Sequence, residues 1–148
     1  MGALEASRRV QIDAPPDRCY RIAADLERTP EWQESMVSLE VLERDGEGRP
    51  ELVEIVTDAK IRQVTSRMRF AYDPPTGLSW EQEKGDAKWL TGSWTFEEHG
   101  GGTRAVYELK ADPGRMLGLL LRGPVEGKVK DFLTKDSTEG LKRAAESA

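Results

Sequence analysis

The sequence has one cysteine, one histidine and few aromatic side chains, which make up 7% of its 148 residues. A single cysteine cannot form a disulfide within the chain, so the sequence gives no sign of an oxidising compartment. One histidine and one cysteine are too few soft ligands for a zinc site. We therefore expect neither a bound metal nor another cofactor.

Long apolar segments are also missing. No apolar stretch reaches the roughly 18 residues that a membrane-spanning helix needs. Residues 1–9 contain no apolar core of a secretion signal. We therefore expect a cytoplasmic protein without an integral membrane segment.

The chain has no excess of positive charge. It carries 22 Lys and Arg against 27 Asp and Glu, which gives a net charge of −5. Nucleic-acid surfaces need a basic patch, so we expect no nucleic-acid partner. The length predicts one domain, residues 1–148. Such a chain buries roughly 68–70% of its unfolded surface, which is enough for a core with a pocket.

Most of the chain does contain a regular alternation of apolar and polar residues. Alternation with a period of two predicts strands, and Gly, Pro and Asp mark the turns between them. The predicted strands cover residues 8–12, 36–42, 51–57, 60–72, 78–84, 88–98 and 104–110. Each has one apolar face, so we expect an antiparallel sheet with one dry side.

Helical periodicity is found after the first strand and at the end of the chain. A first helix, ending near residues 25–28, is predicted from the spacing of Cys19, Ile22, Ala23 and Leu26. Thr29 as N-cap and Pro30 as first residue predict a second short helix. A long helix is predicted over residues 124–148, with an apolar stripe formed by Val125, Val129, Phe132, Leu133, Gly140 and Ala144.

The dry side of the sheet must be covered, and the last helix is the long element that remains. We therefore predict an α+β helix-grip fold, in which a curved antiparallel sheet of about seven strands wraps around the C-terminal helix. Two short helices follow the first strand.

Several short fragments occur in an informative order: IDAPP at residues 12–16, ADLERTPEW at 24–32, GSWTF at 92–96, GGGTR at 100–104, YEL at 107–109 and LKR at 141–143. Their order and spacing resemble the START/Bet v 1-like (SRPBCC) superfamily, and most closely its bacterial polyketide cyclase/dehydrase and lipid-transport group. The resemblance runs from Val10 to Glu146. It implies an elongated apolar cavity that holds a lipid-like or polycyclic molecule. It implies no particular reaction, because carriers, cyclases and hydrolases share the fold.

Side chains on the apolar faces are the candidate ligand contacts. From the strands and the last helix we predict Met68, Phe70, Trp80, Trp94, Phe96, Tyr107, Val129, Phe132 and Leu133. Aromatic residues at such positions are also ordinary core residues, so the pattern alone does not separate the two roles.

Asp136, Tyr72 and Arg67 are the candidate catalytic residues. Asp136 lies on the apolar side of the last helix, where burial would raise the pKa of its carboxyl group and suit it to acid–base chemistry. Alternatively, the helix end leaves the sheet and Asp136 is solvated. Tyr72 is predicted to face inward. The resemblance implies an arginine in the site of aromatic polyketide cyclases, and Arg67 is the nearest match. The alternation puts Arg67 on the polar face, so only a β-bulge would turn it inward.

Residues 116–121 form the most apolar run of the chain, flanked by Arg115 and Arg122. We expect this run to form a lid over the cavity mouth, with Met116 and Leu120 in contact with the ligand. Alternatively it contacts a membrane or a second copy of the chain, or it is a short helix packed against Trp32 and the sheet edge.

Three functions remain open. The first is binding or transport of a small hydrophobic ligand. The second is a polyketide cyclase or dehydratase that uses Asp136 with Tyr72 or Arg67. The third is a partner-binding module without a ligand. Opposed polar pairs in the cavity favour the enzyme, an apolar lining favours the carrier, and a cavity below about 300 Å³ favours the partner-binding module. The sequence does not decide between a monomer and a homodimer.

Overall fold

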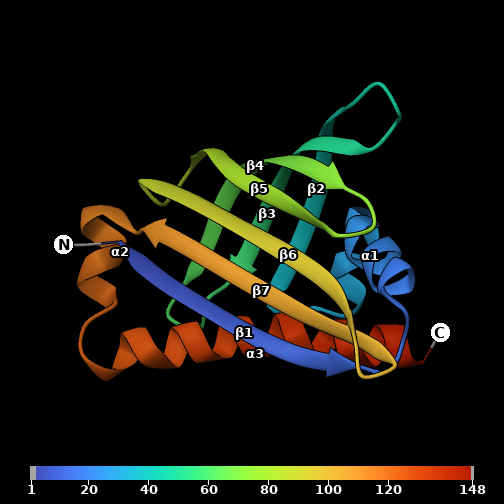
Figure 1. The fold of residues 1–148 in the computed structure, drawn as a ribbon. Coiled ribbons are helices and arrows are strands. Elements are labelled where there is room, and N and C mark those ends of the chain that lie inside the picture. The colour runs from blue at the N-terminus through green and yellow to red at the C-terminus, as the bar shows by residue number, and fades with distance from the viewer. Residues whose placement is uncertain (1–2, 148) are drawn as a thin grey trace.

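The computed structural model describes residues 3–147, which form seven strands, three α-helices and one 3₁₀ helix (Figure 1). Strand β1 (Leu4–Ile12) precedes helix α1 (Pro16–Ala24) and the 3₁₀ helix η1 (Leu26–Glu31). The next six strands are β2 (Met36–Arg44), β3 (Pro50–Asp58), β4 (Gln63–Asp73), β5 (Gly77–Gly85), β6 (Trp89–His99) and β7 (Gly102–Asp112). Helices α2 (Gly114–Leu120) and α3 (Pro124–Glu146) follow. The predicted α+β helix-grip fold is confirmed.

The strands form one sheet in the order β1-β7-β6-β5-β4-β3-β2. Every neighbouring pair is antiparallel. Strands β2 to β7 follow one another as a meander, and β1 pairs with the last strand, with Val10 opposite Ala105. The sheet therefore brings the first and last strands of the chain side by side (Figure 1).

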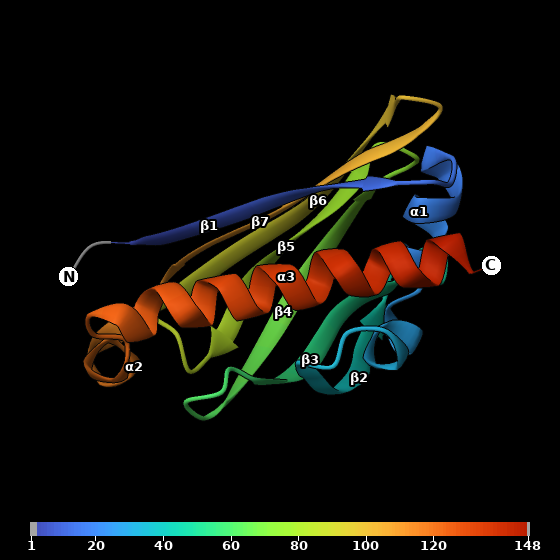
Figure 2. The ribbon, with the colours of Figure 1, turned by 90° about the horizontal axis from the view of Figure 1, so that it is seen from below.

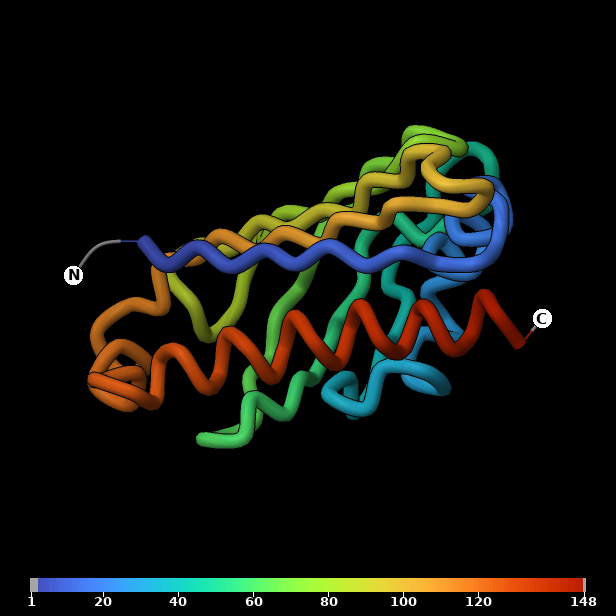
Figure 3. Tube along the Cα trace, turned by 60° about the horizontal axis from the view of Figure 1, so that its bottom comes forward, coloured from blue at the N-terminus to red at the C-terminus, as the bar shows by residue number. Residues whose placement is uncertain are grey.

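Helix α3 runs across one side of the curved sheet (Figures 2 and 3). Leu141 and Ala145 on this helix are completely buried. Gly140 allows a close approach of the chain segment after η1, since a Cβ atom at this position would lie 2.1 Å from the Trp32 carbonyl oxygen. A side chain at position 140 would therefore push α3 away from that segment.

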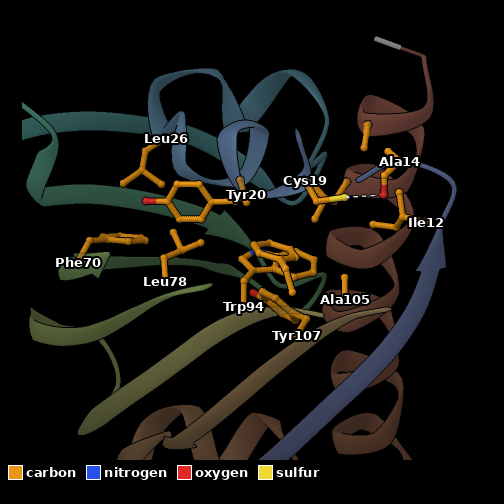
Figure 4. Close-up of a cluster of buried hydrophobic side chains, with 14 of the residues drawn as sticks. Ile12, Ala14, Cys19, Tyr20, Leu26, Phe70, Leu78, Trp94, Ala105 and Tyr107 are labelled. Carbon is orange, nitrogen blue, oxygen red and sulfur yellow. Dashed lines mark hydrogen bonds between the residues drawn. The ribbon is translucent and has the colours of Figure 1, made fainter. Parts of the chain in front are cut away.

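An aromatic cluster forms the core between the sheet and α1 (Figure 4). The rings of Trp94 and Tyr107 are 4.8 Å apart and tilted by 55°. Trp94 also stacks on Phe96, with their ring centroids 5.7 Å apart. Cys19 is fully buried beside this cluster, and burial raises the pKa of its thiol. We interpret Cys19 as a core residue, as its position on the apolar face of the first helix predicts.

The Trp80 ring lies directly over Gly92 of the neighbouring strand, to which Trp80 is paired. A Cβ atom at position 92 would lie 2.3 Å from two atoms of the indole ring. Trp80 also contacts Phe70 and Tyr107, with ring centroids 5.4 and 5.8 Å away. The absence of a side chain at Gly92 thus lets the indole lie close to the sheet.

Some sequence-based boundaries need correction. Thr29 does not cap a second helix: η1 starts at Leu26, because the Asp25 carbonyl already accepts the Arg28 N–H group. Strand β4 starts at Gln63 rather than at Lys60, which lies in a turn with a φ of 73°. The register of β2 shifts between Met36 and Ser38. The alternation predicts Val37 on the same apolar face as Leu39 and Val41, but Val37 is 49% exposed.

Candidate functional site

A cavity of about 220 Å³ lies between the sheet and α3. Its walls are mainly apolar side chains of β3 to β7 and α3, and it extends to α2 and to the segment that follows η1. Among the predicted ligand contacts, the residues that line it are Met68, Phe70, Trp80, Trp94, Tyr107, Val129 and Leu133. All seven lie on the faces that the alternation of the strands and the stripe of the last helix predict to be apolar.

Four residues predicted to touch the ligand lie elsewhere. Phe96 is 3% exposed and packs in the core behind Trp94. The Phe132 ring lies under the Lys60 ammonium group, with Nζ 4.7 Å from the ring centroid. Met116 and Leu120 are exposed on α2. None of these four lines the cavity.

Leu117 of helix α2 and Leu121, the residue that ends the helix, line the cavity instead. These residues are four apart, so they share one face of the helix, whereas Met116 and Leu120 lie on the other face. Leu117 is 7% exposed, against 74% for Met116. A helical period applied to residues 116–121 separates the cavity pair, Leu117 and Leu121, from the exposed pair, Met116 and Leu120.

Asp136 holds the segment after η1 against α3. Its Oδ2 atom accepts a hydrogen bond of 2.8 Å from the Ser35 backbone N–H group. Asp136 is partly buried and is not a cavity residue. The acid on the apolar side of the last helix therefore pairs with the backbone.

Tyr72 is partly buried at the end of β4, and its hydroxyl group donates a hydrogen bond to the Pro50 carbonyl oxygen. The Arg49 guanidinium lies over its ring, 4.8 Å from the centroid. Burial raises the pKa of Tyr72 well above its usual value. Tyr72 is on the same strand face as Phe70 but does not reach the cavity.

Arg67 lies on the outer face of the sheet, where its Nε atom is 3.1 Å from Glu54 Oε1. A bulge does occur beside it: Arg67 pairs with Lys84 and Met68 with Gln82, so Glu83 is the extra residue. The bulge is in β5 rather than β4, and Arg67 therefore keeps its outward direction. The structure does not bring Arg67, Tyr72 and Asp136 together.

Tyr107 of β7 and Ser137 of α3 are neighbours in the cavity wall. Burial raises the pKa of Tyr107 to about 12, the neighbouring Ser137 hydroxyl opposes this rise, and the Asp136 charge adds to it. The Ser137 hydroxyl also donates a hydrogen bond to the Leu133 carbonyl oxygen at 3.0 Å. A neutral Tyr107 is thus a hydrogen-bond donor and not a base at neutral pH.

The cavity also has polar residues that the sequence did not indicate. Glu126 and Lys130, an ion pair of 3.4 Å within α3, lie in its wall. Helix η1 adds Thr29, and the segment after it adds Trp32, Gln33 and Ser35. The sequence predicts Thr29 as a helix cap, and no sequence pattern marks Gln33 or Ser35 as cavity residues. Among residues 3–147, no group of three or more His, Cys, Asp or Glu side chains could hold a metal ion.

The curved sheet, the long helix across it and the apolar space between them define a helix-grip protein of the START/Bet v 1-like class. The chain belongs to the polyketide cyclase / dehydrase and lipid transport family, whose model matches residues 3–146. No curated protein matches the sequence. None of the helices described here is long and apolar enough to cross a membrane.

Several solved structures have a similar fold. A START superfamily protein from Mycobacterium smegmatis is 17% identical over 99% of both chains, with a TM-score of 0.84. Protein TTHA0849 from Thermus thermophilus is 28% identical over 97% of both chains, with a TM-score of 0.81. An aromatase/cyclase from a Streptomyces species is 18% identical over 99% of both chains, with a TM-score of 0.71.

Proposed function

We propose that this protein binds or carries a small hydrophobic molecule in the cavity between the sheet and α3. The observation that carries this proposal is the apolar lining, to which Met68, Phe70, Trp80 and Leu133 contribute. Burial of apolar ligand surface against such side chains is favourable by about 25 cal/mol per Å². The family description, which includes lipid transport, supports the same function.

The volume of the cavity limits the size of the ligand. At about 220 Å³ it is below the roughly 300–1,000 Å³ of typical small-molecule sites. A ligand of one or two rings, or a short alkyl chain, fits this space better than a large polycyclic molecule. The small volume also favours the alternative that the domain binds a partner and that the cavity is a packing defect of its core.

A cyclase or dehydratase activity has weaker support. Arg67 points away from the cavity on the outer face of the sheet, the Tyr72 hydroxyl donates to a backbone carbonyl, and Asp136 accepts the Ser35 N–H group. Tyr107 and Ser137 are a polar pair of the kind an enzyme would need, but Tyr107, with its pKa raised to about 12, remains protonated at neutral pH. Binding without chemistry therefore accounts for more of these residues.

Helix α2 is the proposed lid through which the ligand enters. Its buried face, with Leu117, lines the cavity, while its other face exposes Met116, Leu119 and Leu120 to solvent. A short helix held by few buried side chains can open at low cost, as lids do.

Native mass spectrometry of protein purified without added ligand tests the proposal. A co-purified hydrophobic molecule supports it, and the variant Val129→Trp, which fills the cavity, should lose that molecule. Val125→Trp is the matched control, because it lies one turn earlier on α3 and does not line the cavity. If no molecule co-purifies and none of a panel of hydrophobic compounds raises the melting temperature, the partner-binding alternative replaces the proposal.

A further inference from the structure

One wall of the apolar cavity is polar. It is formed by the end of η1 and the segment that joins η1 to β2, where Thr29, Trp32, Gln33 and Ser35 all line the cavity. Thr29, Gln33 and Ser35 are 4%, 7% and 1% exposed. Four residues with polar side-chain atoms within seven positions thus line a cavity whose walls are mainly apolar.

Three of these side chains carry a polar atom without a partner. Thr29 Oγ1, Trp32 Nε1 and Ser35 Oγ are buried and form no hydrogen bond within residues 3–147. These three are the complete set of such atoms in the described chain. A buried polar group without a partner destabilises a protein, so three in one segment need an explanation.

Several backbone groups of this segment already have hydrogen-bond partners, which hold its path in place. The Thr29 carbonyl oxygen accepts the N–H groups of Trp32 and Gln33 at 3.1 and 2.9 Å. The Ser35 N–H group donates to Asp136, and the Ser35 carbonyl oxygen accepts the Asp58 N–H group at 2.7 Å. The unused hydrogen-bonding capacity is therefore in the side chains, and a single χ1 rotation redirects the hydroxyl of Thr29 or Ser35.

The charges among the residues that line the cavity disfavour an anionic group at this wall. The nearest lining residue on α3 is the neutral Ser137, and the Asp136 carboxylate lies behind Ser35. The one basic side chain in the described lining, Lys130, is seven residues before Ser137, roughly 10 Å along the helix, and is paired with Glu126. The indole N–H of Trp32 can only donate a hydrogen bond.

We propose that Thr29, Trp32 and Ser35 bind the single neutral polar group of the ligand, a carbonyl or a hydroxyl group that accepts hydrogen bonds. The apolar body of the ligand lies against Met68, Phe70 and Leu133. This inference rests on the proposed function and names the class of ligand: a small, uncharged ketone, ester, amide or alcohol with one polar end.

Three naphthalene compounds of similar size test this class: acetonaphthone, ethylnaphthalene and naphthoate. Dissociation constants are measured by calorimetry for the wild-type chain and for Thr29→Val, which removes the hydroxyl and keeps the shape. Thr29→Val should weaken acetonaphthone about fivefold, the effect of one hydrogen bond, and leave ethylnaphthalene unchanged. Naphthoate should bind more weakly than acetonaphthone, because its charge would be buried without a partner.

Thr134→Val is the matched control. Thr134 is also 4% exposed, but its hydroxyl already donates to the Lys130 carbonyl oxygen at 2.8 Å and it does not line the cavity. This control should not change the preference between acetonaphthone and ethylnaphthalene. Acetonaphthone, and not ethylnaphthalene, should also shift the NMR signal of the Trp32 indole N–H, which Trp32→Phe identifies.

The stability of the ligand-free protein gives a second readout. Thr29→Val should keep or raise the melting temperature, because it removes an unpaired buried hydroxyl, whereas Thr134→Val should lower it. The inference is overturned if Thr29→Val weakens both neutral compounds equally, or if naphthoate binds tightest. If none of the three compounds binds, both the proposed function and this inference fail. If all three bind and Thr29→Val has no effect on any of them, the inference about the polar contact is overturned and the proposed function stands.

Discussion

The Ser35 backbone N–H group donates a hydrogen bond of 2.8 Å to Asp136 Oδ2, across 101 residues of sequence. This bond joins the start of β2 to the middle of α3. Asp136 lies among the apolar residues of its helix because its partner is the backbone of another segment. The bond also holds the polar wall of the cavity in position.

Replacement of Asp136 should therefore reduce stability more than replacement of an exposed acid on the same helix. Asp136→Ala leaves the Ser35 N–H group without a partner, at a cost of about 1–3 kcal/mol in the free energy of unfolding. Asp136→Asn should cost less, because its amide oxygen can still accept the bond. Urea unfolding measures both. Asp131→Ala on the exposed face of the same helix is the control, and an equal loss for Asp131→Ala would refute the explanation.

Arg67 should be unnecessary for ligand binding. Arg67→Ala removes a surface ion pair with Glu54, worth about 0–1 kcal/mol, and should leave the dissociation constant of a bound compound within a factor of about two. Met68→Ala, the inward neighbour, should cost about 2–5 kcal/mol in stability and weaken binding, since it enlarges the cavity. Calorimetry on both variants makes the comparison; a large loss of binding in Arg67→Ala alone would return this residue to the site.

The raised pKa of Tyr107 predicts a loss of stability at alkaline pH. Its folded pKa of about 12 exceeds the ordinary value of 10, so its contribution is complete below pH 10 and is lost as the pH rises toward 12. Between about pH 9 and pH 11, the wild-type chain should lose on the order of 1 kcal/mol more than Tyr107→Phe. Urea unfolding across this range measures the difference. Parallel curves for the two proteins would show that Tyr107 has an ordinary pKa.

Helix α2 should control how fast a ligand leaves. Leu117→Ala removes the main buried side chain of the proposed lid, which costs about 2 kcal/mol or more, so the dissociation rate should rise at least about tenfold. Met116→Ala changes an exposed residue of the same helix and should leave the rate unchanged. Stopped-flow displacement of a bound fluorescent compound measures both rates. Equal rates for both variants and the wild type would show that the ligand enters elsewhere.

The fold could be predicted because its signals are local. Alternation along β4 and β6 marks the inward faces of Met68, Phe70 and Trp94, and the stripe of α3 marks Val129 and Leu133. These patterns arise from burial, which acts on every second residue of a strand and on one face of a helix.

The polar wall could not be predicted, because its members come together through the path of the chain. Thr29 and Pro30 have the pattern of a helix start, yet the 3₁₀ helix begins earlier, and Thr29 lies inside it. The position of Asp136 on the apolar side of α3 predicts a buried acid, but its partner is a backbone group that no sequence pattern reveals. The direction of the Arg67 side chain depends on which strand carries the bulge, and the extra residue is Glu83 of β5.

The indole of Trp80 rests on Gly92, a residue that does not line the cavity. The space available to a ligand therefore depends in part on Gly92, which lies behind Trp80 and does not contact the ligand itself. One added methyl group at position 92 must displace Trp80, whose ring lines the cavity and contacts Phe70 and Tyr107. Relatives with a side chain at this position would select smaller ligands, although every residue in contact with the ligand stayed the same.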